Sequence, residues 1–225
     1  MQRIFIGLAI VATLLLVANV VLGLSGGDYN AAAHAYYQQG ELLKQLQSGD
    51  ADAATIAAGA ARHDELRAQA KSLQPLMTQH MLLGILGALM TLLACSVSIT
   101  YFVGTSRWFK EVVDTYRLDQ AYVDRSQRTK RQSFRWSIIG ALVIMVVVGL
   151  GAASEPTWAN ARYSPDFVIP HYVAALIALG VLIVSFYMQG ASLAANGKLI
   201  EAVMTEVRRI RQQRGLAVEP EPSHS

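Results

Sequence analysis

Four long stretches of this chain contain no charged residue, and they constrain its fold more than any other feature. They run over 4–24, 81–103, 136–153 and 172–193, about 18–23 residues each. A helix rises about 1.5 Å per residue, so each stretch can cross a hydrocarbon core of about 30 Å. Because lipid offers the backbone no hydrogen-bond partners, we expect four membrane-spanning helices.

The pattern predicts an all-α fold, an integral membrane four-helix bundle with an extracytoplasmic helical hairpin and short cytoplasmic helices. The expected segments are span 1 (1–24), the outer hairpin (25–79), span 2 (80–103), a basic cytoplasmic segment (104–135), span 3 (136–153), a short outer loop (154–170), span 4 (171–193), a cytoplasmic helix (194–214) and a disordered tail (215–225).

The basic residues predict the orientation of these spans. Fourteen Lys and Arg residues lie before span 1, in 104–135 or after span 4, against five in the two intervening loops. The positive-inside rule therefore places both termini in the cytoplasm, and we expect the inner (cytoplasmic) membrane. A cleaved N-terminal signal peptide is the alternative for the first span, but its apolar run is longer than the usual h-region of about 7–15 residues.

Local signals predict how the soluble parts are built. A turn is expected at Ser48-Gly49-Asp50, and a second hairpin helix from Asp52 should run into span 2, kinked at Pro75. His63, Leu66, Ala70, Leu73 and Met77 form its apolar seam.

Three further expectations concern the ends of the spans. Thr105 or Ser106 should cap a new short helix over 107–118, and Pro170 should open span 4. Gln189 and Ser192 are expected at the membrane interface rather than deep in the bilayer.

Two apolar stripes are predicted on the cytoplasmic side. Phe109, Val112, Val113 and Tyr116 form one; Ile200, Val203, Val207 and Ile210 form the other. Apolar area in water is unfavourable by about 25 cal/mol per Å², so the stripes should cover each other or a partner. The residues we assign to partner or lipid interaction are Arg107, Trp108, Lys110, Arg128, Lys130, Arg131, Ile200, Val203, Val207 and Ile210.

His80 and His171 are the candidate cofactor ligands. Each opens a span that enters from the outer side, so the two lie at similar depth. Two facing imidazoles are what the axial pair of a b-type haem requires. Two interfacial histidines at helix starts are the simpler interpretation, and we expect no cofactor and no metal.

No catalytic constellation or phosphate-binding loop is present in the sequence, and no charged residue lies within a span, which argues against an ion-coupled transporter. The stretch from Tyr101 to Leu118 is similar to segments of uncharacterised bacterial membrane proteins, which implies no activity. We therefore expect a non-enzymatic membrane scaffold or accessory subunit. Its partners would be the bilayer and a membrane protein or a second copy, without nucleic acid. The alternatives are a haem-carrying electron-transfer subunit and a small transporter or sensor.

Overall fold

The computed structural model describes residues 1–25, 27–156 and 163–216, which form five α-helices and no strand. The helices are α1 (Gln2–Ser25), α2 (Tyr29–Ser48), α3 (Ala53–Tyr116), α4 (Ala121–Ser154) and α5 (Ser164–Gln213). Four of them, all but α2, are long and apolar enough to cross a membrane, which confirms the predicted all-α multi-pass fold. Large apolar side chains on the outer faces of these helices are not covered by other parts of the protein, and they contact the bilayer.

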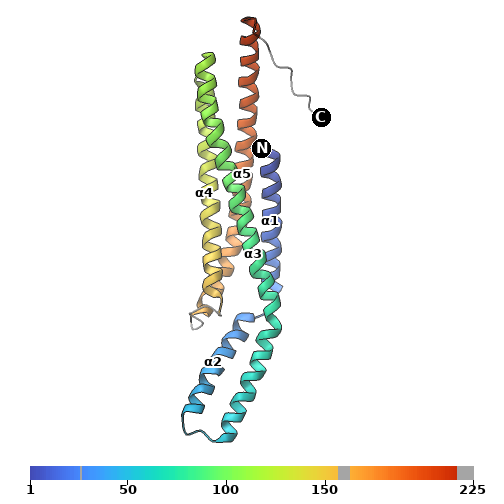
Figure 1. Ribbon diagram of the computed structural model, residues 1–225, viewed down its shortest axis with the longest axis vertical. Coiled ribbons are helices and arrows are strands. Elements are labelled where there is room, and N and C mark those ends of the chain that lie inside the picture. The colour runs from blue at the N-terminus through green and yellow to red at the C-terminus, as the bar shows by residue number, and fades with distance from the viewer. Residues whose placement is uncertain (26, 157–162, 217–225) are drawn as a thin grey trace.

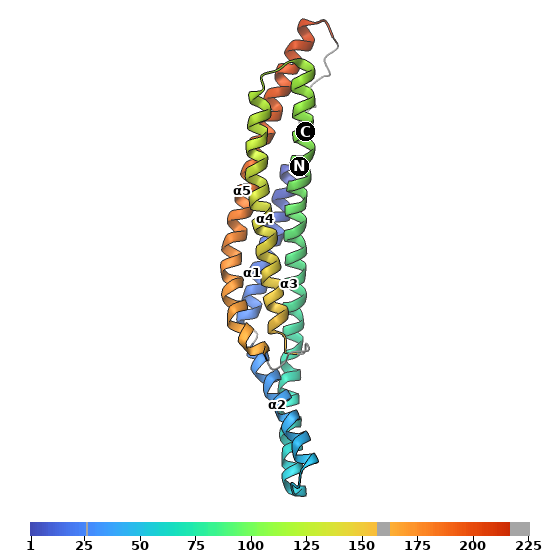
Figure 2. The same cartoon turned by 90° about the vertical axis from the view of Figure 1, so that its left-hand side faces the viewer.

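The four spans form a bundle in which each helix has two neighbours. α1 and α4 both pack against α3 and α5, so α3 and α5 lie diagonally opposite each other. Figure 1 shows α2 and the first part of α3 projecting from one end of this bundle as a hairpin. At the other end α3, α4 and α5 continue beyond the start of α1, and we call this part the three-helix stalk (Figure 2).

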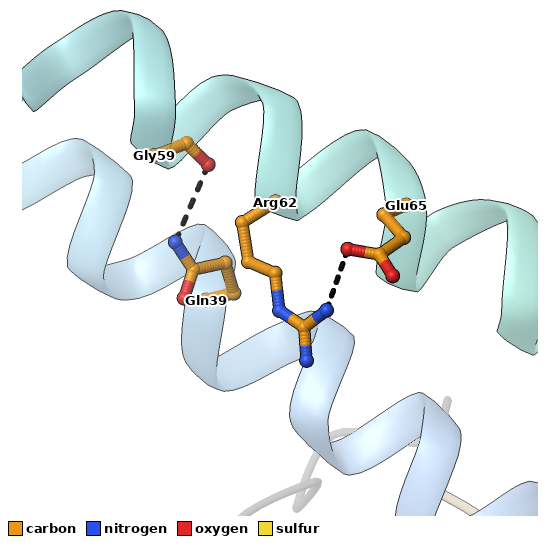
Figure 3. Close-up of polar contacts among 4 residues, drawn as sticks. All are labelled: Gln39, Gly59, Arg62 and Glu65. Carbon is orange, nitrogen blue, oxygen red and sulfur yellow. Dashed lines mark hydrogen bonds and ion pairs between the residues drawn. The ribbon is translucent and has the colours of Figure 1, made fainter. Parts of the chain in front are cut away.

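The hairpin forms where the sequence predicts it. Asp28 and Asp52 each accept a hydrogen bond from a backbone N–H in the first turn of the helix that follows, which supplies the N-caps of α2 and α3. Gln39 of α2 donates to the Gly59 carbonyl of α3 at 3.3 Å (Figure 3). Leu66 of α3 is buried. These contacts hold the two arms together outside the bundle.

The expected break after span 2 is wrong. α3 runs without interruption from the hairpin to Tyr116, so Thr105 and Ser106 do not cap a new helix. The Thr105 hydroxyl instead donates to the Tyr101 carbonyl one turn earlier. Only Gly104 disfavours helix in this stretch, and packing of the following turns against the other stalk helices outweighs its cost.

The short helices expected over 107–118 and 194–214 are likewise ends of longer ones. α4 already begins at Ala121, and α5 extends to Gln213. α5 also starts earlier than expected: Pro165 occupies its first turn, and Pro170 lies inside the helix rather than opening it. The rest of the expected outer loop, 157–162, and the tail from 217 lie outside the described residues.

Candidate functional site

The two candidate histidines meet at the hairpin end of the bundle. His80 of α3 and His171 of α5 have ring centroids 6.4 Å apart, with ring planes inclined by 83°. α3 and α5 lie diagonally across the bundle, so the His80 and His171 rings meet across its interior. The structure thus brings together two residues that are 91 positions apart in the chain.

Each imidazole rests against a glycine of a neighbouring helix. A Cβ atom on Gly23 of α1 would lie 2.9 Å from His80 Cε1, and one on Gly151 of α4 would lie 3.0 Å from His171 Cε1. These distances are shorter than ordinary contacts, so the missing side chains make room for the rings.

The two rings differ in their hydrogen bonds. His80 Nδ1 donates to the Asn19 carbonyl oxygen of α1 at 3.1 Å, which leaves Nε2 free to accept a proton or a metal. His171 Nδ1 is buried, and the nearby Val147 carbonyl does not meet hydrogen-bond geometry with it. The Asn19 side-chain oxygen is also buried without a partner among the described residues. This end of the bundle therefore holds unsatisfied polar atoms, which is unusual in a packed interior.

A polar seam runs along the interior of the bundle, and Gln189 of α5 is one of its two centres. Gln189 is fully buried. Its side-chain oxygen accepts from Ser137 of α4 at 2.8 Å, and its amide nitrogen donates to Ser185 at 3.0 Å. Ser185 in turn donates to the Trp136 carbonyl at 2.7 Å. Gln189 thus faces the interior of the bundle, and its expected depth near the membrane interface stays a prediction.

Ser192, expected at the interface with it, is also buried, with its hydroxyl donating to the Met188 carbonyl at 2.8 Å. The side chains of Ser137, Ser185, Gln189 and Ser192 therefore all have partners inside the protein, as lipid requires. A position near the end of an apolar stretch can still face the other helices, because α3, α4 and α5 continue beyond that stretch.

Asn196 of α5 is the second centre of the seam, and it too is fully buried. Its amide donates to the Tyr101 hydroxyl at 3.1 Å and to the Thr105 hydroxyl at 3.2 Å, both on α3. Its oxygen accepts from Ser126 of α4 at 3.2 Å. One amide therefore joins all three stalk helices where they leave the bundle. Between the two centres, the Ser98 hydroxyl of α3 and the Ser133 hydroxyl of α4 lie 2.7 Å apart.

The sequence carries a signal for this seam that inspection of single spans misses. On α4 and α5 the seam positions recur at steps of three, four or seven residues, which is the spacing of a coiled coil. On α4 they are Ser126, Ser133, Ser137 and Gly140; on α5 they are Ser185, Gln189, Ser192 and Asn196. Hydropathy averaged over a span hides small polar residues that all face one way.

The stalk covers its own apolar stripes. Phe109 of α3 and Val203 of α5 are fully buried in one cluster with Val207, and Ile200 packs against it. The prediction that the two stripes cover each other is therefore confirmed, while Ile210 is half-buried at the end of the helix. A partner could reach Val203 or Val207 only by displacing the residues of α3 and α4 that pack against them.

The charged residues assigned to interaction lie on the outside of the stalk. Arg107 is paired with Glu111 at 2.8 Å, whereas Lys110, Arg128 and Arg131 are exposed. Lys130 lies 5.3 Å from the centre of the Phe134 ring. The indole of Trp108, by contrast, packs edge-on against Phe109 with ring centroids 5.1 Å apart. Trp108 is therefore partly a core residue.

No group of three or more potential metal ligands comes together within the described part of the chain. Comparisons of the chain with protein-family models, with curated proteins and with solved structures found no match.

Proposed function

We propose that the protein is a non-enzymatic membrane scaffold or accessory subunit of the inner (cytoplasmic) membrane, with both termini and the stalk in the cytoplasm and the hairpin outside. The excess of basic residues on the stalk side supports this orientation. The stalk's exposed arginines and lysines can also contact anionic lipid headgroups at its base.

The continuity of α3 is the observation that carries the proposal. Its 64 residues correspond to about 96 Å of helix, roughly three times the thickness of a hydrocarbon core. One element therefore joins the hairpin, the bundle and the stalk. Four spans alone would need neither the hairpin nor the stalk, and both are surfaces that a partner could contact on opposite sides of the membrane.

The hairpin is the surface we expect a partner protein or a second copy to occupy, because the stalk's stripes already cover each other. Leu42 of α2 is 47% exposed there. The test is the mass of the complex after extraction from native membranes into polymer-bounded nanodiscs, measured for the wild type, Leu42→Asp and the lipid-facing control Leu142→Ala. We expect a defined complex larger than the 24.4 kDa chain, lost in Leu42→Asp and retained in the control. A monomer in all three samples would contradict the proposal.

A haem-carrying subunit is the second candidate, favoured by the closeness of the His80 and His171 rings. His80 and His171 would hold the haem, and the group would supply one-electron transfer. The visible absorption spectrum of the purified protein decides between the candidates. A Soret band that both His80→Ala and His171→Ala abolish would favour haem, and its absence from protein expressed with added haem precursor would favour the scaffold.

A further inference from the structure

The hairpin contains a groove on its membrane-proximal half that the scaffold proposal does not use. α2 contributes Tyr29, Ala33, Tyr36 and Tyr37 to its lining, and α3 contributes Arg67, Ala70, Lys71 and Gln74. Its volume is about 290 Å³, close to the lower end for small-molecule sites, near 300 Å³. Both sets recur at helical spacing, so each helix presents one continuous face to the groove.

The groove is hollow because small residues lie between large ones. Ala33 and Ala70 provide lining without long side chains, while tyrosines stand along α2. The Tyr36 ring packs against the His63 ring, with centroids 4.7 Å apart, and against the Tyr37 ring at 5.3 Å. These contacts order the aromatic wall before any ligand binds, which lowers the entropic cost of binding.

The opposite wall carries two positive charges without a counter-ion. Arg67 and Lys71 stand one turn apart on α3, and neither makes an ion pair with any described residue. Arg62, five residues before Arg67, is different: its guanidinium binds the carboxylate of Glu65 at 2.5 Å (Figure 3). Two like charges at this spacing repel each other, and an anion in the groove would relieve that repulsion.

The phenol at the membrane end of the groove is a hydrogen-bond donor. A phenol is protonated at neutral pH, and burial together with the nearby carboxylate of Glu155 raises the pKa of Tyr29 further. The Glu155 charge also disfavours an anion at that end. An anionic group should therefore lie toward Arg67 and Lys71, with the remainder of the ligand against the tyrosines.

We propose that this groove binds an oxyanion, a phosphate ester in particular, between Arg67 and Lys71, with the esterified ring or sugar on Tyr36 and Tyr37. Arg matches the fork geometry of phosphate, Lys adds a point charge, and aromatic rings pack on flat ligand surfaces. Gln74 supplies an amide that can donate to the ester oxygens.

A phosphate ester in this groove could come from either of two sources. Gln74 stands seven residues before the second apolar stretch, about 10 Å along a helix, so the lower end of the groove lies near the lipid headgroup layer. Arg67 stands fourteen residues before that stretch, about 21 Å away, where a soluble ligand would arrive. The ester could thus be a headgroup of the outer leaflet or a free molecule.

The experiment uses the full chain in nanodiscs of zwitterionic lipid, titrated with phenyl phosphate and followed by calorimetry. In a second arm, nanodiscs with increasing phosphatidylglycerol are analysed by native mass spectrometry for retained lipid. We expect saturable binding in one arm, weakened about tenfold by Arg67→Gln or Lys71→Gln. The control Arg62→Gln lies outside the groove and should bind as the wild type does.

The outcomes separate the sources and can overturn the proposal. Binding of phenyl phosphate that depends on both residues identifies a soluble ester as the ligand. Lipid retention alone, with the same dependence, identifies a headgroup. No saturable binding in either arm, or equal binding by Arg67→Gln/Lys71→Gln and the wild type, would overturn it. Circular dichroism of each variant checks that the hairpin remains helical.

Discussion

The side-chain amide of Asn196 donates to the Tyr101 hydroxyl across 3.1 Å, and so joins α5 to α3 where the stalk meets the bundle. The same amide group bonds to Thr105 and Ser126. The buried Asn196 amide can make four hydrogen bonds, and leaving some of them unmade would cost free energy. The bonds therefore fix one relative register of the three helices. The polar seam therefore contributes to specificity as well as to stability.

Asn196→Ala should lower the free energy of unfolding by about 1–2 kcal/mol, since hydrogen bonds between membrane helices average about 0.6 kcal/mol each. The measurement is SDS-induced unfolding of the purified protein, followed by circular dichroism. Gln212→Ala, an exposed amide on the same helix, is the control and should change little. Equal stability of the two variants would show that the Asn196 bonds are not formed.

Gly151→Val should destabilise the hairpin end of the bundle by about 1–3 kcal/mol, because the added side chain must displace the His171 ring. Gly149→Val is the matched control: it lies two residues away on α4, with no atom within 4 Å of its Cβ position. Thermal unfolding of both variants in the same detergent provides the comparison. A harmless Gly151→Val would mean that the two imidazoles do not pack as described.

Val203→Asp should open the stalk and leave the spans folded. It buries a charge beside Phe109, at a cost of about 3 kcal/mol or more. Limited trypsin digestion should then cut the end of α5 at Arg208, Arg209 or Arg211 before any other site. Met204→Asp changes the neighbouring residue, which is 37% exposed, and should leave the cleavage pattern unaltered.

Long-range hydropathy predicted the number and order of the spans, because lipid imposes helical hydrogen bonding on any uncharged stretch of this length. Helix ends were harder to predict. A Thr-Ser pair after an apolar run is a good cap signal in isolation, but packing of Phe109 against Val203 extends α3 through it. Tertiary contacts of this kind override local preference and cannot be read from one segment.

The sequence also indicated that His80 and His171 would lie at one depth, since each begins a span on the same side. Their contact depends on which helices are diagonal in the bundle and on the room left by Gly23 and Gly151, and neither follows from spacing along the chain. The groove of the hairpin was missed for a similar reason. Its tyrosines and its cations lie on different helices, about 40 residues apart, and meet only when α2 folds back on α3.

The proposed topology requires the hairpin and the stalk to lie on opposite sides of one membrane. Single cysteines at Asp50, in the hairpin turn, and at Gln213, at the end of α5, test this with a membrane-impermeant maleimide on intact spheroplasts. The native Cys95 is buried and should add no background. We predict that Asp50→Cys is labelled from outside and that Gln213→Cys is labelled only after permeabilisation. Labelling of both positions, or of Gln213→Cys alone, in intact spheroplasts would contradict the account.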